Sequence, residues 1–77
     1  MITNFVLINT KSGKECEVYD ELIKIPEIKE HHQLFGDYDI IAKIETENIE
    51  KAGQIIIEKI RTIKYVIDTK TLLGIKW

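Results

Sequence analysis

The residues best suited to bind a small polar ligand stand together in one stretch, Gly36-Asp37-Tyr38-Asp39. Glycine followed by aspartate between two apolar runs is typical of a two-residue hairpin turn, which needs a positive φ at its first position. Such a turn offers backbone N–H and C=O groups, and a carboxylate there suits the cationic group of a ligand. The commoner use of this pattern is a plain turn that tolerates acidic residues. The turn is therefore a candidate site that needs support from its surroundings.

Two threonines, Thr69 and Thr71, form a second candidate. Their spacing of two places both hydroxyls on the same face of a strand. Threonine is an ordinary strand-forming residue, but hydroxyls spaced in this way also line shallow polar pockets. Together with the turn, these residues make up the predicted ligand-binding set: Gly36, Asp37, Tyr38, Asp39, Thr69 and Thr71.

The more reactive side chains do not form a metal or catalytic pattern. His31 and His32 are neighbours, and neighbours on a strand point to opposite faces, so their rings do not share one ion. The sequence has no third histidine, and Cys16 is its single cysteine. No base stands at a recognisable spacing to activate that thiol. We therefore predict no metal, no cofactor and no catalytic residue.

Composition limits the class of protein. The 77 residues make one domain, 1–77, with a net charge of −2 and a pI of about 5.6, which disfavours a nucleic-acid surface. A lone cysteine indicates a reducing compartment, and we expect a cytoplasmic protein. We find no apolar run long enough to span a membrane and no signal peptide. The 16 isoleucines exceed what so small a body buries, which predicts a subunit interface.

Hydrophobic periodicity predicts six elements. Strands are expected at 2–9, 28–35, 38–45 and 65–77. A helix opens at a capping box, Ser12 to Glu15, and ends by Pro26. A second helix begins after the N-cap Asn48 and ends near residue 63. One apolar face of that helix is predicted from Ile49, Ala52, Gly53, Ile56, Ile57, Ile60 and Ile63.

Strand alternation assigns side chains to faces. The core face of the third strand is expected to carry Tyr38, Ile40, Ala42 and Ile44. Its second face carries Asp39, Ile41, Lys43 and Glu45. In the last strand, one face carries Ile67, Leu73 and Ile75 with Thr69 and Thr71 between them, and Leu72 lies on the other.

The order βαββαβ predicts an α+β, ferredoxin-like sandwich. Two helices cover one face of a four-stranded antiparallel sheet. The first and last strands leave apolar residues on the other face, so we expect a second copy of the sheet to pack there by two-fold symmetry. Trp77 is expected to anchor an interface or edge.

With these pieces in place, the chain resembles the ligand-binding domain of the Lrp/AsnC family of transcription regulators, also called the RAM domain. The resemblance rests on Pro26-Glu27-Ile28, on the Gly36-Asp37-Tyr38-Asp39 turn running into Ile40–Ile44, and on Val66-Ile67-Asp68-Thr69-Lys70-Thr71. The amphipathic helix before that strand matches as well. Full-length members begin with a DNA-binding helix-turn-helix, whereas here the first strand is expected from Ile2, so a stand-alone RAM protein without DNA binding of its own is expected.

The resemblance implies dimers that join through their sheets and assemble into rings such as octamers or decamers. It also implies a small effector, usually an amino acid, held between dimers by Gly36, Asp37, Tyr38, Asp39, Thr69 and Thr71. A full-length DNA-binding relative is an expected partner, which places the function in the regulation of amino-acid metabolism. Two alternatives stay open: a small dimeric enzyme of the monooxygenase type, and a purely structural subunit of mixed oligomers.

Overall fold

The computed structural model describes residues 1–74. The predictions for Ile75, on a face of the last strand, and for Trp77, at an interface or edge, fall outside this range. Strands and helices follow the predicted order: β1 (Ile2–Thr10), α1 (Glu15–Leu22), β2 (Ile28–Gln33), β3 (Ile40–Thr46), α2 (Ile49–Ile55) continued by a π-helical segment η1 (Ile56–Ile60), and β4 (Val66–Leu73).

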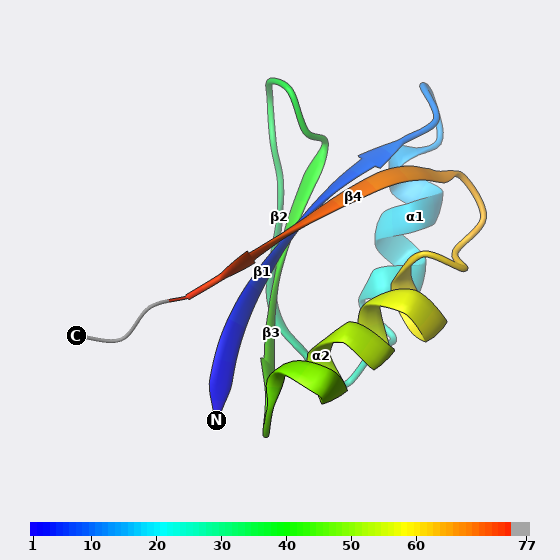
Figure 1. The fold of residues 1–77 in the computed structure, drawn as a ribbon. Helices are drawn as coiled ribbons and strands as arrows, with labels where there is room; N and C mark the ends of the chain where they lie inside the picture. Colours follow the sequence, from blue (N-terminus) through cyan, green and yellow to red (C-terminus); the bar gives the residue numbers. More distant parts are fainter. Residues whose placement is uncertain (75–77) are drawn as a thin grey trace.

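The four strands form one antiparallel sheet in the order β2-β3-β1-β4. Both helices lie on the same side of this sheet (Figure 1). The ferredoxin-like prediction is therefore confirmed. β1 and β3 are the central strands, and β2 and β4 form the two edges.

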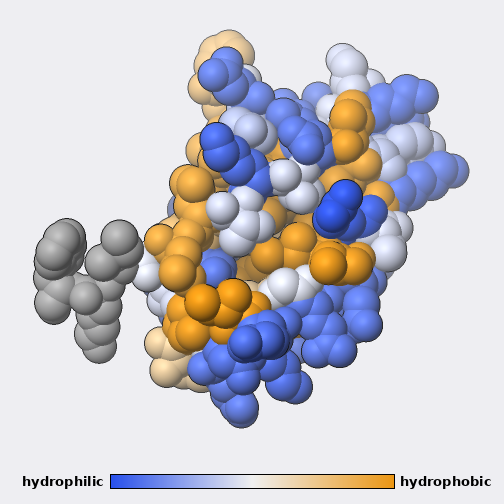
Figure 2. Space-filling model, viewed as in Figure 1, coloured by the Kyte–Doolittle hydropathy of each residue, from blue (hydrophilic) through white to orange (hydrophobic). Residues whose placement is uncertain are grey.

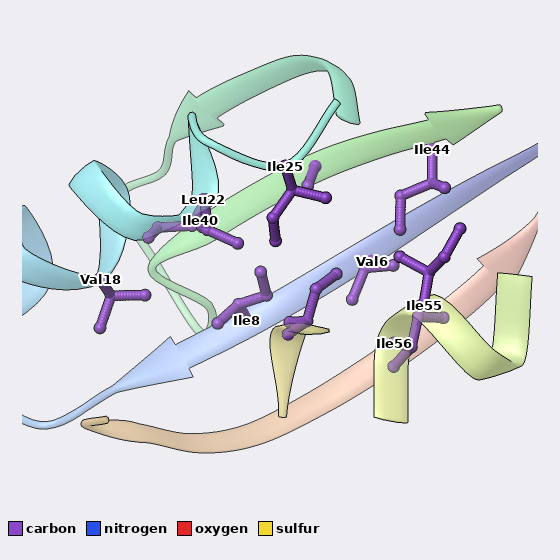
Figure 3. Packing of buried hydrophobic residues seen from close by; sticks show 11 residues of the cluster. Val6, Ile8, Val18, Leu22, Ile25, Ile40, Ile44, Ile55 and Ile56 are labelled. Carbon is purple, nitrogen blue, oxygen red and sulfur yellow. The ribbon is translucent and has the colours of Figure 1, made fainter. Parts of the chain in front are cut away.

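The core lies between the sheet and the helices. Alternate residues of β1 and β3 point into it, and the buried side chains of the two strands and the two helices interlock there (Figure 3). Val6 and Ile8 are fully buried, as are Ile40 and Ile44 on the neighbouring strand. The predicted core face of the third strand is thus confirmed from Ile40 onward. Burial of these aliphatic chains supplies the main stabilising term, at roughly 1.5–3 kcal/mol for each side chain.

The first helix begins differently from the prediction. Its N-cap is Lys14, without a side-chain hydrogen bond, so the capping box at Ser12 is wrong. Gly13 has φ +83, and its N–H donates to the Glu15 carboxylate at 3.3 Å. This tight turn uses the Glu15 side chain that the capping box needs. At the other end, Ile25 lies in the core, whereas Ile23 is exposed.

The second helix has the predicted cap, and it buries Ala52, Ile56 and Ile60 of the predicted apolar face. The Asn48 side chain accepts a hydrogen bond from the Lys51 N–H at 2.8 Å, which confirms the N-cap. Ile49 and Ile57 are exposed, whereas Ile55 is buried. Isoleucines occupy so many positions of this helix that more than one face is apolar. The packed face is the one that meets β1 and β3.

The β2–β3 connection is longer than the two-residue turn predicted. Six residues, 34–39, separate the strands, and the Leu34 N–H donates to the Asp39 C=O at 2.7 Å. Gly36 does adopt a positive φ, +146. Asp39 is also bound to β1, because its N–H donates to the Ile8 C=O at 3.0 Å. Residue 39 is therefore hydrogen-bonded on both sides, which leaves residues 35–38 as the turn.

Candidate functional site

The carboxylate of Asp39 is already used inside the chain. One oxygen, Oδ2, accepts from the Thr10 N–H at 2.8 Å and from the Thr10 hydroxyl at 3.2 Å. Thr10 is buried at the end of β1, where the pairing with β4 becomes irregular. Asp39 therefore closes the end of β1, and its carboxylate is less free for a ligand than the sequence indicated.

The tip of the same loop is open. Phe35, Gly36 and Asp37 are exposed, and Tyr38 is half-buried. Phe35 projects entirely into solvent, and none of the ion pairs within residues 1–74 involves Asp37. Asp37 is thus the available carboxylate of the turn, and the exposed backbone of Gly36 permits close approach of another molecule.

Thr69 and Thr71 lie on the helix side of β4, along a groove between that strand and α2. Their partners in β1 are Ile8 and Val6, whose side chains face the helices, so the threonines share that face. The groove has a volume of about 360 Å³. Seen from the side of Figure 1, hydrophobic atoms gather around β4 and α2 (Figure 2). The predicted shallow polar pocket therefore has an apolar wall.

The sequence did not single out two residues of this groove: Asn4 lines its floor, and Arg61 borders it after η1. The wall comes from the predicted apolar face of the second helix, where Ile49, Gly53 and Ile57 form a stripe spaced by four residues along α2 and η1, with Ala52 and Ile56 beside it. A signal for Asn4 was present, since strand alternation places it on the same face as Val6 and Ile8. A polar residue on an apolar face is informative.

One chain does not bring the two candidate sets together. The loop before β3 and the threonines of β4 lie on opposite sides of β1, because Ile8 pairs with Ile40 on one side and with Thr69 on the other. Two strand spacings, about 10 Å, separate the start of β3 from Thr69. The loop and the threonines are therefore two separate candidate sites within one chain.

The two histidines point to opposite faces, as predicted. His31 is half-buried beneath α1, where its ring packs edge-on against Tyr19 with centroids 4.6 Å apart, and its Nδ1 is hydrogen-bonded to the Tyr19 hydroxyl. His32 lies exposed on the other face beside Glu30. Within residues 1–74, no three acidic, histidine or cysteine side chains cluster around a common point. Cys16 is exposed on α1.

The face of the sheet opposite the helices mixes apolar and charged groups. Phe5 and Leu7 are half-buried there, and Leu72 pairs with Phe5 from the edge strand. Lys43 forms ion pairs with Glu30 at 3.2 Å and with Glu45 at 3.6 Å. The hydrogen bond to Glu30 is the main cause that raises the pKa of Lys43. We refer to this surface, formed by Phe5, Leu7, Ile41, Lys43 and Leu72, as the open face.

Neither helix in the described part of the chain has the length and apolar character to cross a membrane.

The fold and the groove define a ferredoxin-like domain with a small-molecule-sized cleft between its last strand and second helix. A model of the Lrp/AsnC ligand-binding domain matches residues 3–76, so the chain belongs to the Lrp/AsnC family. The HTH-type transcriptional regulator FL11 of Pyrococcus furiosus is 39% identical over 75 residues, which are 97% of this chain and 49% of that protein. The chain therefore spans about half the length of this relative. A homocitrate synthase of Sulfurisphaera tokodaii is 44% identical over 52 residues, which are 68% of this chain and 11% of that enzyme.

Solved structures agree with this assignment. FFRP-DM1 superimposes with a TM-score of 0.91 at 41% identity, covering 97% of this chain and all of that one. AsnC of E. coli gives 0.92 at 26% identity, covering 97% of this chain and 51% of that one. A transcriptional regulator of Neisseria meningitidis, solved as a complex with L-Met, gives 0.88 at 14% identity, covering 97% and 50%. At that identity the last match shows the fold alone.

Proposed function

We propose that residues 1–77 form a single effector-binding and oligomerisation module whose effector is an amino acid. The module acts in the cytoplasm on the transcription of genes of amino-acid metabolism, through its own assembly or through a DNA-binding relative. The observation that carries this proposal is the separation of Asp37 from Thr69 and Thr71 by β1. A ligand held by both sets bridges two copies, and its binding is thereby coupled to assembly.

The chemistry of the two sets suits a zwitterion. An ammonium group needs a carboxylate or carbonyl acceptor, which the exposed Asp37 and the backbone of the loop supply. A carboxylate needs N–H or O–H donors, which the exposed loop and the threonine hydroxyls supply. The structurally similar regulator of Neisseria meningitidis was solved as a complex with L-Met, which supports an amino acid as the class of effector.

Assembly follows from the same geometry. The open face carries half-buried aliphatic and aromatic side chains that a second sheet would cover, which supports a two-fold dimer. Dimers would then meet through the exposed loop and the groove, closing a ring such as an octamer or decamer. A ligand that contacts two dimers favours the ring by its difference in affinity for the two states.

A binding role is favoured over an enzyme of the monooxygenase type. The buried polar side chains of residues 1–74 are Asn4, Thr10 and Thr46, and none of the three titrates in the physiological range. Acid–base catalysis inside the sandwich needs such a group. The similarity to 11% of a homocitrate synthase fits a small module that accompanies larger proteins of different kinds.

Calorimetry across the twenty amino acids at millimolar concentration, followed by sedimentation with and without the best ligand, tests the proposal. We expect binding heat for at least one amino acid and a larger assembly in its presence. Asp37→Ala and Thr71→Val are expected to lose both responses, whereas Thr62→Val, on the exposed helix end, retains them. No heat from any amino acid would leave only the structural-subunit alternative.

A further inference from the structure

The amide group of Asn4 is buried and incompletely used. The side chain is 3% exposed, on the floor of the groove between α2 and β4. Its Nδ2 has no hydrogen-bond partner within residues 1–74. Buried polar groups are nearly always paired, because an unpaired donor loses its bonds to water and gains nothing in return. The groove above this donor is the route by which a partner would reach it once the amide turns about χ2.

The other polar groups of the groove indicate the chemical class of the ligand group that pairs with Asn4. Thr69 and Thr71 offer hydroxyls, and Arg61 offers a guanidinium. None of the ion pairs within residues 1–74 involves Arg61. No acidic residue lines the groove. Donors and a positive charge therefore favour a ligand with oxygen acceptors, and they disfavour a cationic ligand group.

The apolar wall of the groove limits the shape of the ligand. Ile49, Gly53 and Ile57 present an apolar surface along α2, and a Cβ added at Gly53 would meet nothing within 4 Å. A glycine in a helix interior is destabilising relative to alanine. Its position beside open space widens the groove and does not relieve a close contact. The groove therefore suits an aliphatic stem that ends in a polar oxygen.

We infer that Asn4 determines the specificity of this site, and that it selects an amino acid whose side chain ends in a carbonyl or carboxylate oxygen, such as glutamine or glutamate. The inference rests on the proposed function and specifies its ligand. The aliphatic stem of the effector lies along the α2 stripe, and its terminal oxygen accepts from the Asn4 Nδ2. The terminal amide of asparagine turns easily about χ2, so presenting this N–H₂ to the groove needs no movement of the backbone.

Two pairs of ligands separate this inference from plain apolar binding. Glutamine and methionine have side chains of similar length, and only the glutamine side chain ends in an oxygen acceptor. Glutamate and lysine carry opposite charges at the ends of their side chains, with lysine on the longer methylene stem. On the wild-type chain we expect glutamine or glutamate to bind at least about tenfold tighter than methionine and lysine, a difference of about 1.4 kcal/mol. Isothermal calorimetry with each of the four provides the comparison.

Variants of Asn4 test whether this residue causes the preference for glutamine over methionine. Asn4→Leu is expected to abolish the preference for glutamine over methionine, and Asn4→Ala does the same without adding bulk. Asn9→Leu is the matched control, because Asn9 belongs to the same strand but lies on the open face. In the absence of ligand, Asn4→Leu is expected to raise Tm by about 4–8 °C, since it removes an unpaired buried donor.

Each outcome decides between the claims. Equal or tighter binding of methionine or lysine to the wild type would overturn the role of Asn4 while leaving the proposed amino-acid function intact. A glutamine preference that survives in Asn4→Ala would overturn that role in the same way. A fall in Tm for both Asn4 variants, with Asn9→Leu unchanged, would show that the amide already has a structural partner and would also overturn the inference. No response to any amino acid would remove the proposed function and this inference together.

Discussion

The Asp39 carboxylate binds Thr10 twice, through its N–H at 2.8 Å and its hydroxyl at 3.2 Å, across 29 residues of sequence. This relationship joins the loop before β3 to the end of β1. It also alters the expectation that Asp39 is free to bind an effector. The Asp39 carboxylate is charged, partly buried and hydrogen-bonded twice. Its main role is therefore to stabilise the fold.

Asp39→Ala is therefore expected to lower the free energy of unfolding by about 1–3 kcal/mol, because the buried Thr10 N–H loses its partner. Thr10→Val removes only the hydroxyl bond and should cost less. Asp37→Ala, in the exposed part of the same loop, should change stability by no more than about 0.5 kcal/mol. Urea unfolding of the three variants measures these differences. Equal costs for Asp37→Ala and Asp39→Ala would contradict the structural role of Asp39.

Local sequence pattern was sufficient for most of the fold but not for this loop. Alternation at Ile40, Ala42 and Ile44 identified the buried face because each residue's own position sets its direction. The hydrogen bonds of Asp39 to Thr10 and Ile8 join segments that are distant in sequence, so no local pattern predicted them. In α2, isoleucines lie on several faces, so the choice of Ile55 over Ile49 came from the packing of the sheet.

The candidate site shows the same division. Thr69 and Thr71 were recognisable because a spacing of two is a local feature, and their common face is confirmed by the register with β1. Strand alternation already placed Asn4 on the face of Val6 and Ile8, but only the folded chain brings it beside α2. Arg61 came to border the groove through the course of η1, which periodicity did not predict.

The ion pair between Glu27 and Lys59 predicts a dependence of stability on pH. The Lys59 Nζ lies 3.1 Å from the Glu27 Oε1, and this hydrogen bond is the main cause that lowers the pKa of Glu27 below its ordinary value of 4.5. A lowered carboxyl pKa stabilises the fold above the unfolded-state pKa. That stabilisation is lost as the pH falls through the folded-state pKa.

Glu27→Gln should consequently lower the free energy of unfolding at neutral pH by at most about 1 kcal/mol, because both side chains are partly exposed. The difference from wild type should shrink as the pH falls below 4.5, the ordinary value for glutamate. Chemical unfolding at a series of pH values measures it. Glu58→Gln, at an exposed site on η1, serves as the control, and a difference that grew in acid would contradict the assigned ion pair.

Two substitutions of Gly53 are expected to affect stability and ligand binding differently. Gly53→Ala should raise the free energy of unfolding by about 0.5–1 kcal/mol, since a Cβ there meets open space and alanine is the better helix former. Gly53→Leu should keep the fold but occupy the groove, lowering amino-acid affinity by about tenfold or more. Thermal unfolding and calorimetry give the two readouts. Gln54→Leu, on the exposed side of the same helix, should leave affinity unchanged.

Leu72 and Leu73 are adjacent residues of β4 that test the proposed dimer. Both are about half exposed, at 45% and 50%, but Leu72 pairs with Phe5 on the open face and Leu73 with Asn4 on the helix side. If two sheets pack through their open faces, Leu72→Asp places an unpaired carboxylate in an apolar contact. The dimer dissociation constant should then rise by at least about tenfold, and Leu73→Asp should leave the two-fold dimer intact. Sedimentation at micromolar concentration distinguishes the variants, with circular dichroism to verify folding. We expect the wild type to remain associated there, and a folded wild-type monomer, or equal effects of both substitutions, would exclude the open face as the dimer interface.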